Sequence, residues 1–67
     1  MKVYLNNKEF DIEPFTNLFD FLEQLNLHTI SNSAVAINNT VIIRRCWNDT
    51  ILNDNDKIIL INAICGG

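Results

Sequence analysis

Hydrophobic and polar residues alternate over the first twelve positions of the chain. The apolar positions in this stretch are Val3, Leu5, Phe10 and Ile12. A period of two is typical of a half-buried β-strand, and Asn6-Asn7 suits a two-residue hairpin turn because Asn tolerates positive φ. The pattern therefore predicts a β-hairpin with these four apolar side chains on its buried face.

The pattern changes to a helical period after Pro14, which is expected to end the second strand. Apolar residues then recur at i, i+3, i+4 and i+7, in Leu18, Phe21, Leu22 and Leu25. Asn17 is a suitable N-cap, and Asp20 three residues later gives a weak variant of the capping box. Phe19 is expected at the margin of the stripe, and the helix is predicted to end near Asn26.

Short apolar runs separated by polar residues fill the second half of the chain. After a loop at 31–33, Val35 and Ile37 begin a third strand, and Asn38-Asn39 turns the chain into a return strand at 41–43. Residues 44–52 are predicted to form an irregular crossover anchored by Trp47 and Ile51. A turn at 54–56 then precedes a last strand, over residues 57–61.

The element order β-β-α-β-β-β predicts an α+β fold, because one amphipathic helix covers only one face of a sheet. A last strand between the hairpin and the third strand would give the ubiquitin-like β-grasp arrangement. The expected fold is thus a mixed sheet of four to five strands packed on one helix. The expected organisation is a β-grasp domain over 1–64 and a flexible C-terminal reactive tail over 65–67.

The last strand also divides its side chains between two faces. Lys57 is not expected to point beneath the helix, so Ile58 and Leu60 are predicted to face the core. Ile59 and Ile61 then lie on the open face of the sheet. Together with Tyr4 and Ala36 they are expected to form an apolar patch that docks a partner protein; the alternative is ordinary exposed apolar surface.

Both glycines of the chain, Gly66 and Gly67, stand at its C-terminus, where they serve no turn. Residues without a Cβ allow close approach to another molecule. The pair therefore indicates a thin end that enters a narrow space and presents its carboxylate there. The alternative interpretation is a frayed terminus.

Composition narrows the class of protein. A chain of 67 residues forms one small domain, and 48% hydrophobic residues give it a core without metal or disulfides. Cys46 and Cys65 lack the spacing of a metal or redox pair, which favours a reducing compartment. The net charge of −3 argues against nucleic acid. With neither a leader peptide nor an apolar run of about 20 residues, the chain is expected to be cytoplasmic, with no membrane partner.

An ordered set of motifs resembles the thiamine-biosynthesis sulfur-carrier proteins (ThiS-like), a ubiquitin-like β-grasp family with a C-terminal Gly-Gly. The matching pieces are residues 2–6 (KVYLN), 22–25 (LEQL) and 35–38 (VAIN), Arg44 with Trp47, residues 54–56 (DND) and Gly66-Gly67. Three residues depart from the family pattern. Asn17 stands where Thr is frequent, Asn55 where Gly is usual, and Cys65 where a small inert residue is typical.

The resemblance implies a protein co-substrate and not an enzyme. A ThiF-like adenylating enzyme would activate Gly67 with ATP and Mg²⁺, and a cysteine desulfurase would provide the sulfur. The resulting thiocarboxylate at Gly67 would donate sulfur to thiazole synthase. The carrier itself would bind no cofactor and contribute no acid, base or metal ligand.

Three other functions remain open from the sequence. The first is the small subunit of molybdopterin synthase, whose chain is usually longer and commonly has proline before the glycines, where Asn62-Ala63 stand here. The second is a modifier conjugated to lysines through Gly67, and the third is a β-grasp binding module with an inert tail.

Of the remaining polar residues, His28 and Arg44-Arg45 are predicted to be solvated surface groups. Trp47 is expected in the core, and Asp54 and Asp56 are expected to be turn residues.

Overall fold

The N-terminal hairpin forms as the alternation predicts. The computed structural model describes residues 1–27 and 33–62. Strands β1 (Lys2–Leu5) and β2 (Lys8–Asp11) pair antiparallel across Asn6 and Asn7, whose φ angles of 49° and 71° are those of a two-residue hairpin turn. The predicted inner face is confirmed, because Val3 and Leu5 are buried and the apolar side chains of β2 and its exit pack against them.

Helix α1 (Leu18–Gln24) begins at the predicted cap. The side-chain oxygen of Asn17 accepts a hydrogen bond of 2.7 Å from the backbone N–H of Asp20, which satisfies one of the free amides of the first turn. The helix buries Leu18, Phe21 and Leu22, whereas Phe19 and Leu25 are half-buried. Asn26, with φ 59°, takes the left-handed conformation that commonly follows a helix end.

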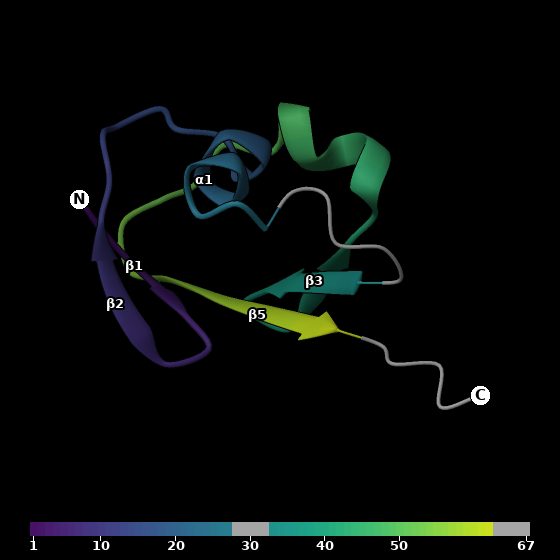
Figure 1. Ribbon diagram of the computed structural model, residues 1–67. Coiled ribbons are helices and arrows are strands. Elements are labelled where there is room, and N and C mark those ends of the chain that lie inside the picture. The colour runs from purple at the N-terminus through teal and green to yellow at the C-terminus, as the bar shows by residue number, and fades with distance from the viewer. Residues whose placement is uncertain (28–32, 63–67) are drawn as a thin grey trace.

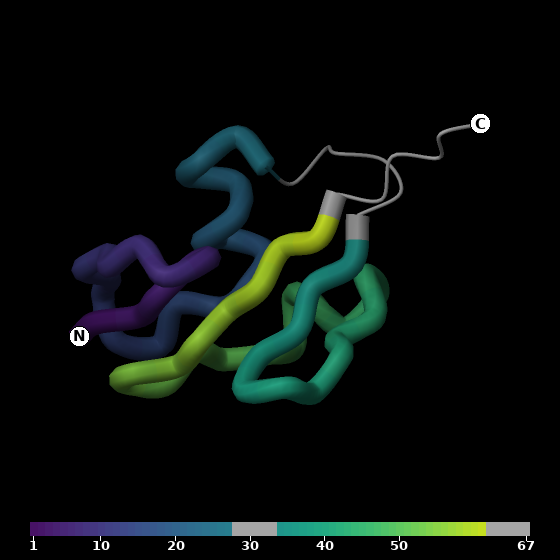
Figure 2. The backbone as a smooth tube through the Cα atoms, turned by 90° about the horizontal axis from the view of Figure 1, so that it is seen from below, coloured from purple at the N-terminus to yellow at the C-terminus, as the bar shows by residue number. Residues whose placement is uncertain are grey.

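The last strand is the centre of the sheet. β5 (Asp56–Asn62) runs parallel to β1 and antiparallel to β3 (Ser33–Ile37). β3 pairs with β4 (Thr40–Ile42) across Asn38-Asn39, so the strand order is β2-β1-β5-β3-β4. Figure 2 shows β5 running between the hairpin and β3. The predicted β-grasp topology is therefore confirmed. Of the predicted loop at 31–33, Ser33 belongs to β3, and residues 31 and 32 lie outside the described residues.

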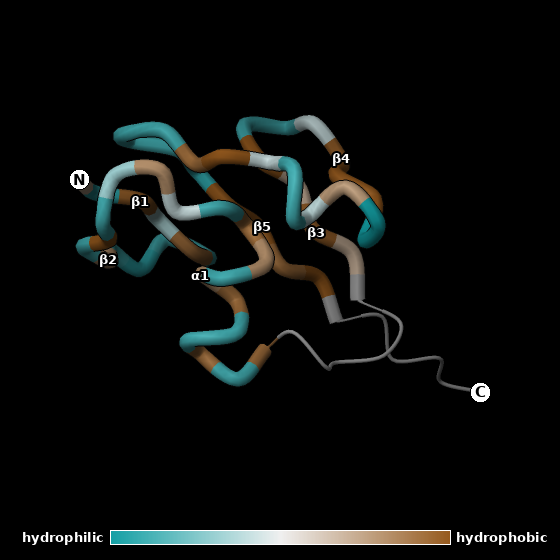
Figure 3. The backbone as a smooth tube through the Cα atoms, turned by 90° about the horizontal axis from the view of Figure 1, so that it is seen from above, coloured by the Kyte–Doolittle hydropathy of each residue, from teal (hydrophilic) through white to brown (hydrophobic). Residues whose placement is uncertain are grey.

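One face of the sheet is covered and the other is open. Helix α1 and the short helix η1 (Arg44–Asp49) both lie above the same face (Figure 1). Viewed from the helix side, apolar segments of β3 and β5 run next to each other beneath them (Figure 3). Within residues 1–27 and 33–62, no helix or strand covers the opposite face, which is called the open face below.

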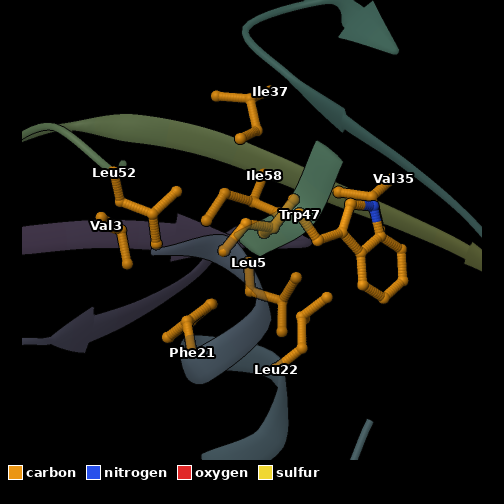
Figure 4. Close-up of a cluster of buried hydrophobic side chains, with 10 residues drawn as sticks. Val3, Leu5, Phe21, Leu22, Val35, Ile37, Trp47, Leu52 and Ile58 are labelled. Carbon is orange, nitrogen blue, oxygen red and sulfur yellow. The ribbon is translucent and has the colours of Figure 1, made fainter. Parts of the chain in front are cut away.

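The core fills the space between the helices and the covered face. Trp47 lies beside Val35 and Ile58, while Phe21 and Leu22 extend from α1 toward the sheet (Figure 4). The indole Nε1 of Trp47 donates a hydrogen bond of 3.1 Å to the carbonyl of Ile42, so the buried ring retains a partner for its N–H. The prediction that Trp47 is a core residue is confirmed.

The predicted crossover at 44–52 is wrong in two respects. Residues 44–49 form a six-residue 3₁₀ helix in place of irregular chain, and the second anchor is Leu52, not Ile51. The exposed fraction is 47% for Ile51 and 1% for Leu52. The cause is a short extended pairing with the segment before α1, in which Leu18 N–H donates to Thr50 O at 2.8 Å and Leu52 N–H to Thr16 O at 2.9 Å. Because neighbouring side chains of extended backbone point in opposite directions, fixing Leu52 inward turns Ile51 outward.

Candidate docking surface on the open face

The predicted reactive tail lies outside the residues that the structure describes. This applies to Cys65, Gly66 and Gly67, and also to His28. The reactivity of Gly67 therefore stays a prediction. The described part of the candidate site is the open face of the sheet, whose central strand leads directly toward these residues.

The sheet register brings the predicted docking residues onto the open face. Ile59 lies opposite Ala36, and Tyr4 lies opposite Lys57. Cross-strand partners project from the same side of a sheet, and this side is opposite to the buried Ile58. Ile59 is exposed, Ile61 is 55% exposed, and Tyr4 and Ala36 are half-buried. The predicted face is therefore correct, and the docking role of these residues stays a prediction.

Val41 belongs to the same surface, although the sequence did not single it out. It lies opposite Ala36 and is 66% exposed. Ala34, also exposed, lies opposite Ile61. The signal was present in the alternation of β4, where Ile42 packs against the core and Val41 therefore faces outward. The apolar patch is hereafter Ala34, Ala36, Val41, Ile59 and Ile61.

A hollow of about 350 Å³ adjoins the apolar patch, where the two asparagine turns meet β5. Its lining includes Tyr4, Asn7, Asn38, Asn39, Lys57 and Ile59. Ile59 thus belongs to both features. The hollow and the apolar patch consequently form one continuous surface across the middle of the open face.

Side-chain amides fix the two turns that border this hollow. Asn6 accepts from Leu60 N–H at 3.0 Å and donates to Leu60 O at 3.3 Å. Asn38 accepts from Lys57 N–H at 3.0 Å and donates to the Asp56 carboxylate at 2.9 Å. Both turns are therefore held to β5 from opposite sides.

The two carboxylates at the start of β5 have structural partners. Asp54 lies in the turn, as predicted, whereas Asp56 is the first residue of β5 and not a turn residue. Asp54 accepts a hydrogen bond of 2.9 Å from Lys2 N–H. Asp56 is buried and accepts from the Asn38 amide at 2.9 Å and from Asn53 N–H at 2.8 Å. Asn55 between them has φ 69°, so asparagine adopts the left-handed conformation where the resembling family usually has glycine.

Two features are absent from the part of the chain that the structure describes. Within residues 1–27 and 33–62, no group of three or more His, Cys, Asp or Glu side chains is placed to hold a metal ion. In the same residues, no helix combines the length and the apolar character needed to cross a membrane.

The strand order, with one α-helix on one face of a five-stranded mixed sheet, defines a ubiquitin-like β-grasp protein. Residues 3–67 match the sequence model of the ThiS family. The sulfur carrier protein ThiS of Escherichia coli (strain K12) is 30% identical over 67 residues, which are all of both chains. The chain belongs to the ThiS family, as the resemblance of its motifs predicts.

Solved structures show the same fold. The crystal structure of the thiamine biosynthesis protein ThiS from Geobacter metallireducens superposes with a TM-score of 0.85, at 22% identity and over all of both chains. The solution structure of a thiamine biosynthesis protein from the same organism gives a TM-score of 0.73 at 22% identity. It matches over 100% of this chain and 88% of that one.

Proposed function

We propose that this chain is a sulfur carrier in thiamine biosynthesis and that its C-terminal Gly67 bears the sulfur. The observation that carries the proposal is the extent of the family match, which runs over residues 3–67 and so includes Gly66-Gly67. The Escherichia coli relative, which is matched over its whole length, is a sulfur carrier protein. The chain is a small carrier in this proposal and leaves catalysis to its partners.

Sulfur transfer to Gly67 needs activation because a carboxylate is a poor electrophile. In the proposed reaction, a ThiF-like adenylating enzyme joins the Gly67 carboxylate to AMP, using ATP and Mg²⁺, and releases pyrophosphate. The outer sulfur of a cysteine persulfide, supplied by a cysteine desulfurase, then displaces AMP and forms an acyl disulfide at Gly67. A second thiol cleaves the S–S bond of this acyl disulfide by exchange and is itself oxidised to a disulfide. The product is a thiocarboxylate at Gly67, the sulfur donor for thiazole synthase. Gly66 and Gly67 have no side chains to obstruct entry into the ATP site.

The position of the apolar patch suits docking of the activating enzyme. Ile61 is six residues before Gly67, so the C-terminal carboxylate lies at most about 21 Å from it along extended chain. An enzyme that covers the apolar patch therefore has to place its ATP site within this distance. Burial of exposed Ile59, Ile61 and Val41 would supply the hydrophobic part of the binding free energy.

The test of the proposal is the intact mass of the carrier after incubation with ATP, the adenylating enzyme and a cysteine desulfurase. Replacement of one oxygen by sulfur adds about 16 Da. Deletion of Gly67 should leave the fold unchanged in circular dichroism and abolish ATP–pyrophosphate exchange. The terminal carboxylate of the shortened chain stops about 3.5 Å short.

Two results would contradict the proposal. One is undiminished ATP–pyrophosphate exchange by the chain without Gly67. The other is a mass gain only with the enzyme that activates molybdopterin synthase, which would favour the small subunit of that synthase instead. The thiamine pathway in particular is tested with thiazole synthase. Transfer of sulfur from the Gly67 thiocarboxylate into the product of that enzyme would assign the chain to this pathway.

A further inference from the structure

Within residues 1–27 and 33–62, most cationic side chains have an acidic or aromatic partner, and Lys57 has none. The Lys2 ammonium lies 3.3 Å from the Glu9 carboxylate, whose hydrogen bond and negative charge raise the pKa of Lys2. Lys8 lies 5.6 Å from the ring centroid of Phe10, and Arg44 lies 4.6 Å from that of Trp47. In the described part of the chain, the Lys57 ammonium has neither an ion pair nor a ring contact.

The surroundings of Lys57 are favourable for an anion. It carries the only charge among the residues that line the 350 Å³ hollow, and no carboxylate lines it. This positive site stands out on a chain with a net charge of −3. It also lies beside the apolar patch, because Ile59 lines the hollow and belongs to the patch.

Neutral donors complete the lining. The side chains of Tyr4, Asn7 and Asn39 make no hydrogen bond with any residue in 1–27 or 33–62, although each residue contributes to the hollow. The amide of Asn38, in contrast, is occupied by Asp56 and Lys57 N–H. The hollow thus combines one ammonium with unused hydroxyl and amide groups, the donor types that a carboxylate accepts from.

We propose that the hollow receives an aspartate or glutamate side chain of the adenylating partner, paired with Lys57, when the partner covers the apolar patch. This inference rests on the proposed function and specifies the chemistry of the partner's surface. A protein carboxylate fits better than a phosphate, because the one ammonium in the hollow balances the single charge of a carboxylate and not the charge of about −1.5 to −2 that a phosphate group carries near neutral pH. A free anion would also leave the adjoining apolar patch uncovered.

The pairing is expected to strengthen on docking. Coverage of the apolar patch excludes water from its border, and the attraction between two charges increases as the local dielectric falls. Charge pairs of this kind also steer the encounter of two proteins and set its dependence on salt. Lys57 is therefore a determinant of partner recognition, and chemistry at Gly67 does not require it.

The test compares Lys57→Glu with Arg45→Glu, a matched change of charge. Arg45 is also exposed but belongs to η1, above the covered face. In ATP–pyrophosphate exchange at low salt, Lys57→Glu should raise the KM for the carrier about tenfold with kcat unchanged. Arg45→Glu should match the parent, and Lys57→Arg should restore most of the affinity. The difference should shrink at 0.5 M salt, where screening is strong.

A zero-length carbodiimide crosslink gives an independent readout, since it joins a lysine to a carboxylate only in direct contact. Peptide mass spectrometry of the complex should find Lys57 linked to an Asp or Glu of the partner. Crosslinks that involve other lysines and never Lys57 would overturn the proposal.

The outcomes separate this inference from the proposed function. An active parent with equal KM values for Lys57→Glu and Arg45→Glu overturns the inference alone. A parent that supports neither exchange nor the mass gain overturns the proposed function, and the inference with it.

Titration of the free carrier with inorganic phosphate is the third experiment. Saturable NMR shifts of Lys57, Asn7 and Asn39 below millimolar phosphate would identify a small-anion site and overturn docking of a carboxylate.

Discussion

The side-chain amide of Asn6 pairs with the backbone of Leu60 as a neighbouring strand would. Its oxygen accepts from Leu60 N–H at 3.0 Å, and its nitrogen donates to Leu60 O at 3.3 Å. The parallel register of β1 and β5 stops at Leu5 and Ile58, so this amide extends the ladder beyond the end of β1. Leu60 lies between Ile59 and Ile61, and the pairing therefore fixes the part of β5 that carries the apolar patch.

Replacement of Asn6 by glycine should destabilise the chain by about 1–2 kcal/mol, the net value of two intramolecular hydrogen bonds. Glycine retains the positive φ of 49° at this position, so the substitution removes the amide without straining the turn. The measurements are urea unfolding and hydrogen exchange of Leu60 N–H, which should lose protection.

Asn7→Gly is the matched control for this substitution. Asn7 lies in the same turn with φ 71°, and its side chain makes no hydrogen bond to a described residue. Its replacement should change stability by only a few tenths of a kcal/mol and leave Leu60 protected. Equal losses for the two variants would show that the turn conformation matters and the amide pairing does not.

Phe15 has a left-handed backbone conformation, which is unfavourable for a residue with a bulky side chain. Its φ is 68°, and the side chain is 86% exposed. The other non-glycine residues with positive φ in the described chain are all asparagines, which tolerate this region better. Phe15→Asn should therefore stabilise the protein by about 0.5–1 kcal/mol in urea unfolding.

The reverse exchange is the control for Phe15. Asn55→Phe introduces the same ring at φ 69° on another exposed residue and should destabilise by about 1–2 kcal/mol. A loss of stability in Phe15→Asn would contradict the prediction and assign a packing role to the exposed ring.

Features set by local sequence could be predicted, and those set by distant contacts could not. The asparagine turns, the Asn17 cap and the two faces of β5 follow from short-range patterns. Which of Ile51 and Leu52 is buried does not follow from such patterns, because it depends on hydrogen bonds to the segment before α1, more than 30 residues earlier. The hollow beside Lys57 likewise forms between two turns that only the sheet brings together.

This distinction predicts unequal effects for two neighbouring substitutions. Leu52→Ala should cost about 2–5 kcal/mol, since Leu52 is 1% exposed in the core and truncation leaves a cavity. Ile51→Ala should cost less than about 1 kcal/mol, because that side chain is half in solvent already. Both free energies of unfolding are measured with urea. A larger loss of stability for Ile51→Ala would show that Ile51 is the anchor, as expected from the sequence.

Ile61→Asp should weaken docking to the adenylating enzyme with little loss of stability. Ile61 is exposed on the open face, and an aspartate there places a charge against the apolar surface that is expected to cover it. Ile58→Asp, three residues earlier and fully buried, should prevent folding. Circular dichroism checks the fold, and titration calorimetry measures the binding. An unfolded Ile61→Asp or an unchanged affinity would remove Ile61 from the docking surface.

Cys65 is the departure from the family pattern closest to the reactive end, and its thiol is expected to be passive. A thiol at this position could attack the activated carbonyl of Gly67 and release AMP, or it could exchange with the acyl disulfide of the transfer step and release the partner's thiol. Reaction requires the thiolate, and an ordinary cysteine, with a pKa near 8.5, is only a few per cent ionised at about pH 7. Extended binding of the tail in the partner would also keep Cys65 away from Gly67. Cys65→Ala should therefore accept sulfur at the rate of the parent, measured by intact mass, with Cys46→Ala as the control. A large change in thiocarboxylate yield or lifetime in Cys65→Ala alone would show that the thiol takes part.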